Sequence, residues 1–191
     1  MIQVIALVGK AGSGKTVVGQ HLVNNYRYKR LRFAERLKAM LYAFGLNERE
    51  VDGDDKGKPC ESLCGQTPRH AMQTLGTEWG RRIIGDDLWV KALERDLIAY
   101  INVGITKFVI DDMRFLNEEA WLDNLYDIIY KHGDMLDTRI IRIIRDVEEI
   151  SKSDGSMHVS ETEMDKIVPD LWIENTGTLE ELYANVGRAL E

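Results

Sequence analysis

The sequence GKAGSGKT at residues 9–16 lies between a short apolar run and a segment of helical character. The run Ile2–Val8 is rich in β-branched residues and predicts a buried strand, and a helix is expected from Lys15 to about Asn24. Glycines in such a connection let the backbone turn so that successive N–H groups point inward, beside the positive end of the helix. A strand, an anion-binding loop and a helix are therefore expected in this order.

The spacing G-x-x-x-x-G-K-[ST] in this loop gives each residue type a role in holding a nucleoside triphosphate. The backbone N–H groups cradle the phosphates, the Lys15 ammonium reaches the β- and γ-phosphates, and the Thr16 hydroxyl ligates Mg²⁺. The residues expected to bind the nucleotide here are Gly9, Lys10, Ala11, Gly12, Ser13, Gly14, Lys15, Thr16 and Val17. A glycine-rich turn that matches by chance is the alternative, and the strand and helix around the loop argue against it.

The composition is typical of one soluble domain, because 44% of the 191 residues are hydrophobic and 30% are charged. The net charge of −7 argues against a general affinity for nucleic acid or an anionic membrane. No apolar run approaches the roughly 20 residues that span a bilayer, and no signal peptide is evident, so a cytoplasmic location is expected. Cys60 and Cys64 have a spacing that matches zinc sites poorly and are expected to be loop thiols.

Strand-like and helix-like segments alternate along the rest of the chain. Further strands are expected at residues 29–33, 107–110, 138–144 and 171–174. Further helices are expected at residues 34–44, after Thr67, after Asp86 or Asp87, from about Asn117, and after Thr178, which opens a capping box. This order predicts a three-layer α/β/α fold with a five-stranded, mostly parallel sheet, in a single domain spanning residues 1–191.

Residues 45–85 are expected to form a substrate-binding arm. Its polar residues 47–66 predict a long loop, and the helix that follows is expected to have a core stripe. The stripe consists of Met72, Leu75 and Trp79. Gly76 and Gly80 lie beside it, although a glycine inside a helix costs about 1 kcal/mol relative to alanine. We expect a flat group to approach the backbone at these glycines, and a close helix–helix contact is the alternative.

Charged residues follow the strand expected at 107–110. Asp111 and Asp112 lie at its carboxyl end, on the same side of the sheet as the phosphate loop, where a carboxylate can hold Mg²⁺ directly or through water. A solvated turn carboxylate is the alternative for one of the two. Arg114, and Arg69 from the arm, could each clamp an acceptor phosphate by bidentate contacts. For each arginine alone a surface ion pair is the alternative, whereas together they favour an anionic second substrate.

Arg145 lies at the end of the strand expected at 138–144 and precedes a polar segment. Residues 146–169 are expected to form a short flap that closes over the phosphates. His158 within it is expected to order the flap or to contact substrate. A general base is not needed, because an acceptor phosphate with a second pKa of about 6 is already a nucleophile at neutral pH.

Four blocks of sequence give the chain its resemblance to a known family. They are the phosphate loop, RHAMQTLGTEWGRRIIGDDLW from Arg69 to Trp89, Asp112-Met113-Arg114, and the tail from His158-Val159-Ser160-Glu161 to NTGTLEEL at 175–182. With these blocks the chain resembles the deoxynucleoside monophosphate kinases of tailed bacteriophages. The resemblance implies a P-loop kinase fold in which ATP, with Mg²⁺, gives its γ-phosphoryl group to a deoxynucleoside 5′-monophosphate. For such a viral protein the host cytoplasm is the expected location.

The same resemblance implies roles for individual residues. The catalytic residues would be Lys15, Asp112, Arg114 and Arg145, with Thr16 and Asp112 at the metal. The monophosphate would be held by Arg69, Gln73, Asp112 and Arg114. Gly76, Trp79 and His158 are further candidates for substrate contact from the helix and the flap considered above. The adenine of ATP would lie beside the loop formed by Asn175, Thr176 and Gly177. Two features depart from the family: the arm at 47–66 is short, and position 111 is not reliably acidic there, which favours Asp112 as the working carboxylate.

Two other functions stay open at this point. The His-x-Ser-Glu and Asp-x-Arg elements also occur in animal-type phosphomevalonate kinases, which keeps open a non-nucleotide acceptor. An ATP-dependent switch that acts with a protein partner would not need Arg69 together with Arg114. Small-molecule substrates are expected as the partners, without nucleic acid or membrane. Trp121 and Tyr126 could line either the interface of a homodimer or the core.

Overall fold

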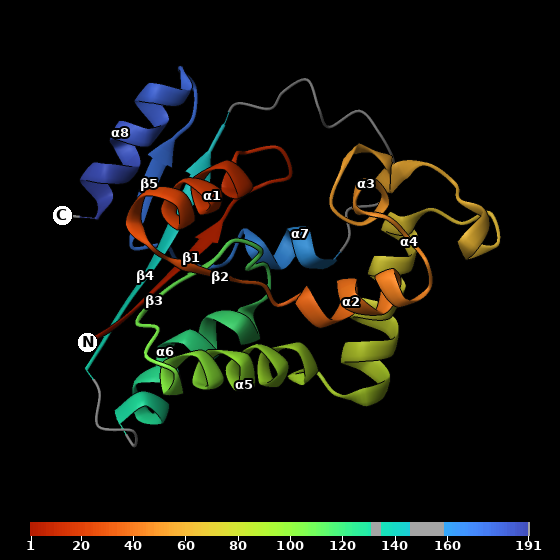
Figure 1. The fold of residues 1–191 in the computed structure, drawn as a ribbon, viewed down its shortest axis with the longest axis horizontal. Coiled ribbons are helices and arrows are strands. Elements are labelled where there is room, and N and C mark those ends of the chain that lie inside the picture. The colour runs from red at the N-terminus through yellow and green to blue at the C-terminus, as the bar shows by residue number, and fades with distance from the viewer. Residues whose placement is uncertain (131–134, 146–158, 191) are drawn as a thin grey trace. The chain divides into compact units, whose positions relative to one another are not determined.

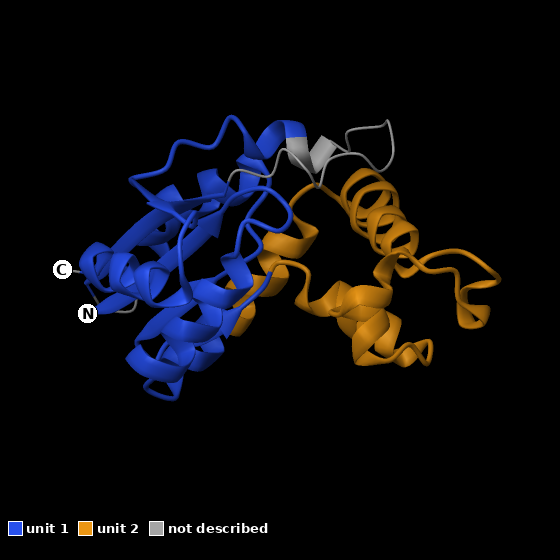
Figure 2. Ribbon diagram, turned by 90° about the horizontal axis from the view of Figure 1, so that it is seen from above, with its two compact units in different colours: residues 1–32, 97–191 blue, residues 33–96 orange. Residues whose placement is uncertain are grey.

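The computed structural model describes residues 1–130, 135–145 and 159–190. The chain forms two compact units, which Figure 2 distinguishes by colour. The first unit comprises residues 1–32 and 97–191, and the second comprises residues 33–96. The second unit is thus an insertion within the first and contains all of the expected substrate-binding arm.

The first unit contains a five-stranded sheet with the order β2-β3-β1-β4-β5 among the described residues. The strands are β1 (Ile2–Val8), β2 (Lys29–Leu31), β3 (Lys107–Ile110), β4 (Leu136–Ile144) and β5 (Leu171–Glu174). Every neighbouring pair in this order is parallel. The predicted parallel sheet is confirmed, with β2 ending two residues earlier and β4 beginning two residues earlier than expected.

Helices cover both faces of the sheet (Figure 1). They are α1 (Lys15–Tyr26), α5 (Leu88–Asn102), α6 (Leu116–Tyr130), α7 (Val159–Met164) and α8 (Leu179–Ala189). On one face Val18 and Leu22 of α1 and Leu182 of α8 share a buried core with Ile5 of β1 and its neighbours. On the other face α6 buries a stripe that contains Trp121, Leu122, Leu125 and Ile129. The three-layer α/β/α arrangement is therefore confirmed.

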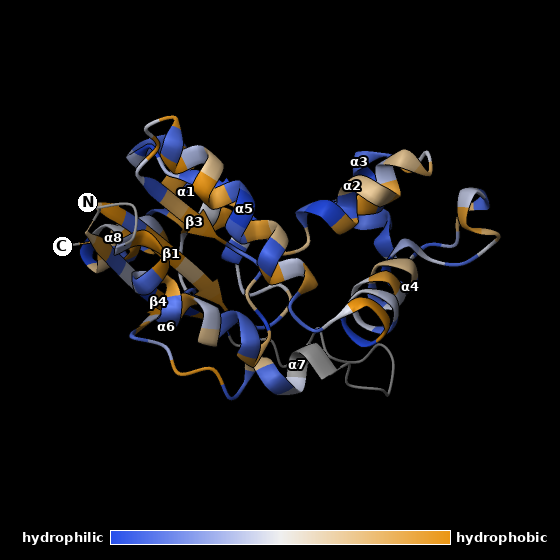
Figure 3. Ribbon diagram, turned by 90° about the horizontal axis from the view of Figure 1, so that it is seen from below, coloured by the Kyte–Doolittle hydropathy of each residue, from blue (hydrophilic) through white to orange (hydrophobic). Residues whose placement is uncertain are grey.

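The burial of β1 explains why its sequence is an almost unbroken apolar run. Six of its seven residues are buried, because the central strand has helices on both faces and hydrogen-bonded strands on both sides. Figure 3 shows the same pattern in β1 and β3, which carry hydrophobic colours along most of their length. Trp121 belongs to this core, with 7% of its surface exposed, whereas Tyr126 is exposed and stacks on Tyr130.

The second unit is helical. Its elements are α2 (Glu35–Ala43), α3 (Glu48–Val51), η1 (Asp54–Gly57), η2 (Glu61–Leu63), α4 (Pro68–Gln73), η3 (Thr74–Ile84) and the beginning of α5. The Thr67 hydroxyl accepts a hydrogen bond from the His70 N–H at 3.1 Å, which confirms the predicted cap of α4. The long loop predicted at 47–66 contains three short helices, α3, η1 and η2, which were not expected. Asn47 and Glu50 form a capping box at the start of α3. These polar residues, which were interpreted as part of a loop, therefore act as helix caps.

The glycine pair in η3 is explained by close contacts with neighbouring helices. A Cβ at Gly80 would lie 2.6 Å from the Trp89 ring of α5, whose Nε1 donates to the Gly76 carbonyl at 2.9 Å. A Cβ at Gly76 would lie 3.1 Å from the Leu37 side chain of α2. Both glycines therefore lie at helix–helix contacts, as the alternative proposed, and the flat group at Gly80 is an indole ring. The expected core position of Trp79 was wrong, since 36% of its surface is exposed. The helix widens to π-type geometry from Thr74, which breaks the 3.6-residue periodicity on which that expectation rested.

Candidate phosphate-binding site

The carboxyl ends of four neighbouring strands lie at one edge of the sheet, because all strands are parallel. The segments that leave this edge are the phosphate loop after β1, Asp111 to Arg114 after β3, Arg145 after β4 and Asn175 after β5. All of them belong to the first unit. The fold thus gathers most of the expected nucleotide-binding residues at a single edge.

The backbone of the phosphate loop is closely packed. A Cβ at Gly9 would lie 2.5 Å from the Ile143 carbonyl oxygen, and Gly9 has a φ of +147°. Gly14, with a φ of +104°, precedes α1, so its positive φ turns the chain into the helix. The Ser13 hydroxyl oxygen is buried and has no hydrogen-bond partner among the described residues. A buried hydroxyl without a partner, beside a helix N-terminus, suits an anion such as a phosphate group.

Lys15 is buried under the loop, and its ammonium donates hydrogen bonds to the carbonyls of Gly9 and Lys10, the latter at 2.8 Å. Burial lowers the pKa of Lys15 from 10.5 to about 8. The positive charge of Arg114 adds to this decrease, and Asp111 and Asp112 oppose it. Lys15, in the first turn of α1, and Arg114, after β3, are therefore cations whose charges repel each other, and an anion bound near both would relieve this repulsion.

The turn after β3 is held by two carboxylates. Asp111 is 4% exposed and forms an ion pair with Arg30, while its other oxygen has no hydrogen-bond partner among the described residues. Glu118, also buried, accepts hydrogen bonds from the backbone N–H groups of Arg114 (2.7 Å) and Phe115 (3.1 Å). These bonds fix the backbone at Arg114, whose side chain is half-buried.

Arg30 and Glu118 were not predicted from the sequence as residues of the site. Arg30 lies on β2, opposite Val109 of β3, and the sequence does not reveal that these two strands are neighbours. The role of Glu118 could have been predicted from the sequence, because a glutamate in the first turn of a helix commonly accepts hydrogen bonds from backbone N–H groups just before the helix. Both residues act by holding Asp111 and Arg114 in place.

The residues expected at the metal are compatible with Mg²⁺. Thr16 is exposed in the first turn of α1, and Asp112 is half-buried at the end of β3. The described residues contain no cluster of three or more histidine, cysteine or acidic side chains that could hold a metal. Mg²⁺ at phosphate sites usually takes one or two protein ligands and completes its shell with phosphate oxygens and water. Thr16 and Asp112 would be sufficient for such a site.

Asn175 lies against the phosphate loop. Its side-chain nitrogen donates to the Ser13 carbonyl at 2.8 Å, and its backbone N–H donates to the Ile144 carbonyl at 2.7 Å. Thr176 and Gly177 are exposed beside it, as is Arg145 after β4. The contact of residues 175–177 with adenine and the action of Arg145 on the transferred group stay predictions.

Four of the expected acceptor-binding residues belong to the second unit. Arg69 and Gln73 are exposed on α4, and Gly76 and Trp79 lie on η3. Their approach to the phosphate loop stays a prediction. His158 and the first part of the expected flap lie outside the described residues. Cys60 and Cys64 are free thiols, as expected.

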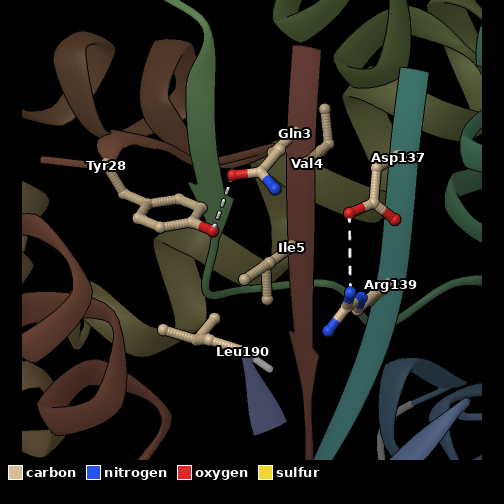
Figure 4. A pocket seen from close by; sticks show the side chains of 7 residues that line it. All are labelled: Gln3, Val4, Ile5, Tyr28, Asp137, Arg139 and Leu190. Atoms are coloured by element: carbon tan, nitrogen blue, oxygen red, sulfur yellow. Dashed lines mark hydrogen bonds and ion pairs between the residues drawn. The ribbon is translucent and has the colours of Figure 1, made fainter. Parts of the chain in front are cut away.

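A small pocket lies at the opposite edge of the sheet (Figure 4). It is lined by Gln3, Val4, Ile5, Tyr28, Asp137, Arg139 and Leu190. Within it the Tyr28 hydroxyl donates to the Gln3 side-chain oxygen at 3.5 Å, and Arg139 lies 3.7 Å from the Asp137 carboxylate. Because it opens at the amino ends of β1 and β4, this pocket is separate from the phosphate loop.

Comparison with solved structures identifies the fold. TT1252 from Thermus thermophilus superposes with a TM-score of 0.53 and 18% identity, covering 99% of this chain and 96% of that protein. A structure from Chloroflexus aurantiacus, described as a "putative kinase", gives a TM-score of 0.52 and 16% identity, with 99% and 94% covered. The chain has the P-loop kinase fold.

Among curated proteins, one from Acanthamoeba polyphaga mimivirus named "Putative deoxynucleotide monophosphate kinase" is 26% identical over 196 residues. The match covers 95% of this chain and 93% of the viral protein. No family model matches the sequence. Among the described residues, no helix is both long enough and apolar enough to cross a membrane.

Proposed function

We propose that the protein is an ATP-dependent kinase that phosphorylates a deoxynucleoside 5′-monophosphate, giving the diphosphate and ADP for DNA precursor synthesis. The observation that carries the proposal is the tightly turned loop before α1, with Lys15 buried beneath it and a buried Ser13 hydroxyl that has no hydrogen-bond partner among the described residues. A loop of this kind at a helix N-terminus is suited to binding phosphate groups. Arg114 beyond the loop supplies charge for a second phosphate group.

Phosphoryl transfer between phosphates requires positioning and charge neutralisation more than proton abstraction. The loop amides and Lys15 would hold the β- and γ-phosphates, while Arg114 and Arg145 would neutralise charge on the transferred group. Mg²⁺, held by Thr16 and Asp112, would supply further neutralisation of the phosphate oxygens. The acceptor phosphate needs no general base, since it is already largely dianionic at neutral pH.

The acceptor-binding residues of this proposal come mainly from the second unit. They are Arg69, Gln73, Gly76 and Trp79, with His158 from the flap at 146–169, whose closure would exclude water. A nucleotide acceptor is supported by the four blocks of family-like sequence and by the name of the mimivirus relative. With residues 175–177 beside the adenine, donor and acceptor would meet at the carboxyl edge of the sheet.

A coupled assay of ADP release tests the proposal. The wild-type protein with ATP and Mg²⁺ is given each deoxynucleoside monophosphate in turn, and phosphomevalonate in a separate reaction. Release stimulated by a nucleotide, and abolished in Lys15→Met, is the expected result. If only phosphomevalonate stimulates ADP release, the acceptor is not a nucleotide and the protein is a kinase of the other acceptor class. If no acceptor increases the rate of ADP release, the proposal is rejected.

A further inference from the structure

The phosphate loop is held from outside by a residue more than 150 positions away in the sequence. Asn175 follows β5, and its side-chain nitrogen donates to the carbonyl oxygen of Ser13 at 2.8 Å. Within the loop, the Ser13 N–H donates to the Lys10 carbonyl at 3.1 Å. Ser13 is thus bound on its N–H side by the loop itself and on its carbonyl side by Asn175.

The steric environment of Gly14 supports a specific fit between the loop and Asn175. A Cβ at Gly14 would lie 2.4 Å from the Asn175 side-chain nitrogen, which is closer than real Cβ contacts come. The glycine therefore leaves the space that the amide of Asn175 occupies. A side chain at position 14 would displace this amide and break its bond to Ser13.

The hydrogen bond to Ser13 determines the direction of the next N–H group. The Ser13 carbonyl and the Gly14 N–H belong to one planar trans peptide, in which the two groups point in opposite directions. Holding the carbonyl oxygen towards Asn175 therefore turns the Gly14 N–H to the other side of the peptide. Gly14 immediately precedes α1, so its N–H belongs to the set of donors that a phosphate at this helix N-terminus uses.

The segment that carries Asn175 is itself fixed at both ends. On one side, the Asn175 N–H donates to the Ile144 carbonyl at 2.7 Å, beyond the last residue of β5. On the other side, Thr178 and Glu181 form a capping box, in which the Thr178 N–H donates to the Glu181 carboxylate at 2.8 Å. The hydrogen bond to Ser13 therefore joins the loop to the sheet and to the start of α8.

We infer that Asn175 is a positioning residue, which holds the Ser13–Gly14 peptide so that the Gly14 N–H faces the nucleotide phosphates. The inference rests on the part of the proposed function in which the loop binds a triphosphate, and it does not depend on the acceptor. It differs from an adenine contact in its consequence. A positioning role affects every ligand that carries a triphosphate, whatever its base.

The test compares dissociation constants of Asn175→Asp and of the wild-type protein for ATP, GTP and inorganic tripolyphosphate, each with Mg²⁺, by isothermal titration calorimetry. Aspartate has the shape of asparagine but presents an acceptor to the Ser13 carbonyl. We expect all three ligands to bind about tenfold more weakly, as for a lost hydrogen bond with added repulsion. Asn175→Ala, which removes the donor without adding repulsion, should weaken all three by about fivefold.

Asn185→Asp is the matched control, because Asn185 also donates from its side chain to a backbone carbonyl, that of Glu174, but away from the loop. This variant should bind all three ligands like the wild type. Weaker binding of ATP with unchanged binding of tripolyphosphate would overturn the inference in favour of a base contact. Unchanged binding of all three ligands in both Asn175 variants would also overturn it. A wild-type protein that binds no triphosphate would instead remove the proposed function, and the inference with it.

Discussion

The buried charge of Lys15 predicts how the stability of the protein depends on pH. Burial and the charge of Arg114 lower its pKa from 10.5 to about 8 in the folded protein. Between these two values the unfolded chain binds more protons at this position than the folded chain does. The free energy of unfolding must therefore rise with pH across this window, because stability increases wherever the unfolded state holds more protons.

The size of the effect follows from the pKa shift. One pKa unit corresponds to about 1.4 kcal/mol, so lowering the pKa from 10.5 to about 8 destabilises the folded protein by about 3 kcal/mol at neutral pH. About 2 kcal/mol of this would be recovered between roughly pH 7 and roughly pH 9.5. Lys15→Met removes the titrating group, and with it the contribution of Lys15 to the pH dependence of the free energy of unfolding. The stability of the wild type relative to this variant should therefore increase by about 2 kcal/mol over that interval.

Urea denaturation followed by circular dichroism measures this difference at the two pH values. Lys10→Met is the matched control, since Lys10 is an exposed lysine of the same loop, and its pH profile should follow that of the wild type. Comparing variants removes the contributions of other groups that titrate at alkaline pH. If the free energy of unfolding has the same pH dependence in the wild type and in Lys15→Met, the reasoning is refuted. Burial would then not lower the pKa of the Lys15 ammonium.

Three further substitutions test other parts of the structure. Arg69→Ala should raise the KM for the acceptor with little change in that for ATP, and an unchanged acceptor KM in the coupled assay would remove Arg69 from the site. Gly80→Ala places a Cβ 2.6 Å from the Trp89 ring and should lower the free energy of unfolding by about 1–3 kcal/mol; an unaltered thermal transition would contradict this packing. Asp111→Asn breaks the ion pair with Arg30 and should destabilise the protein by about 2 kcal/mol in urea denaturation. Equal stability of this variant would show that the pair adds nothing to folding.

The sheet and most of the nucleotide-binding edge were predictable from sequence for a physical reason. Strands that are buried on both faces appear as continuous apolar runs, so β1 and β3 were recognised with their observed bounds. The edge strand β5 was also predicted with its observed bounds, although only Ile173 of its four residues is buried. Parallel strands then bring their carboxyl ends to one edge, which placed the phosphate loop beside Asp111 and Asp112 without knowledge of the strand order. The pairing of Arg30 with Asp111 does depend on that order, and nothing local in the sequence specifies it.

The second unit was predicted less well, because its local geometry departs from regular periods. The widening of η3 rotates Trp79 out of the expected core stripe, and Trp89 from the next helix fills the space that Gly80 leaves. Helical periodicity alone could not show this, since it assumes 3.6 residues per turn throughout. The glycines were recognised as a site of close approach, but the groups that approach them could be named only from the structure.

The second unit is inserted between two strands that are neighbours in the sheet. Lys29 of β2 is in register with Phe108 of β3, so the chain leaves this pair for residues 33–96 and later returns to it. The strands that set the register of the sheet, and the loop at 9–16, contain no residue of that segment. The inserted half can therefore differ in sequence between related chains while every strand pairing and the GKAGSGKT loop are formed by the other half.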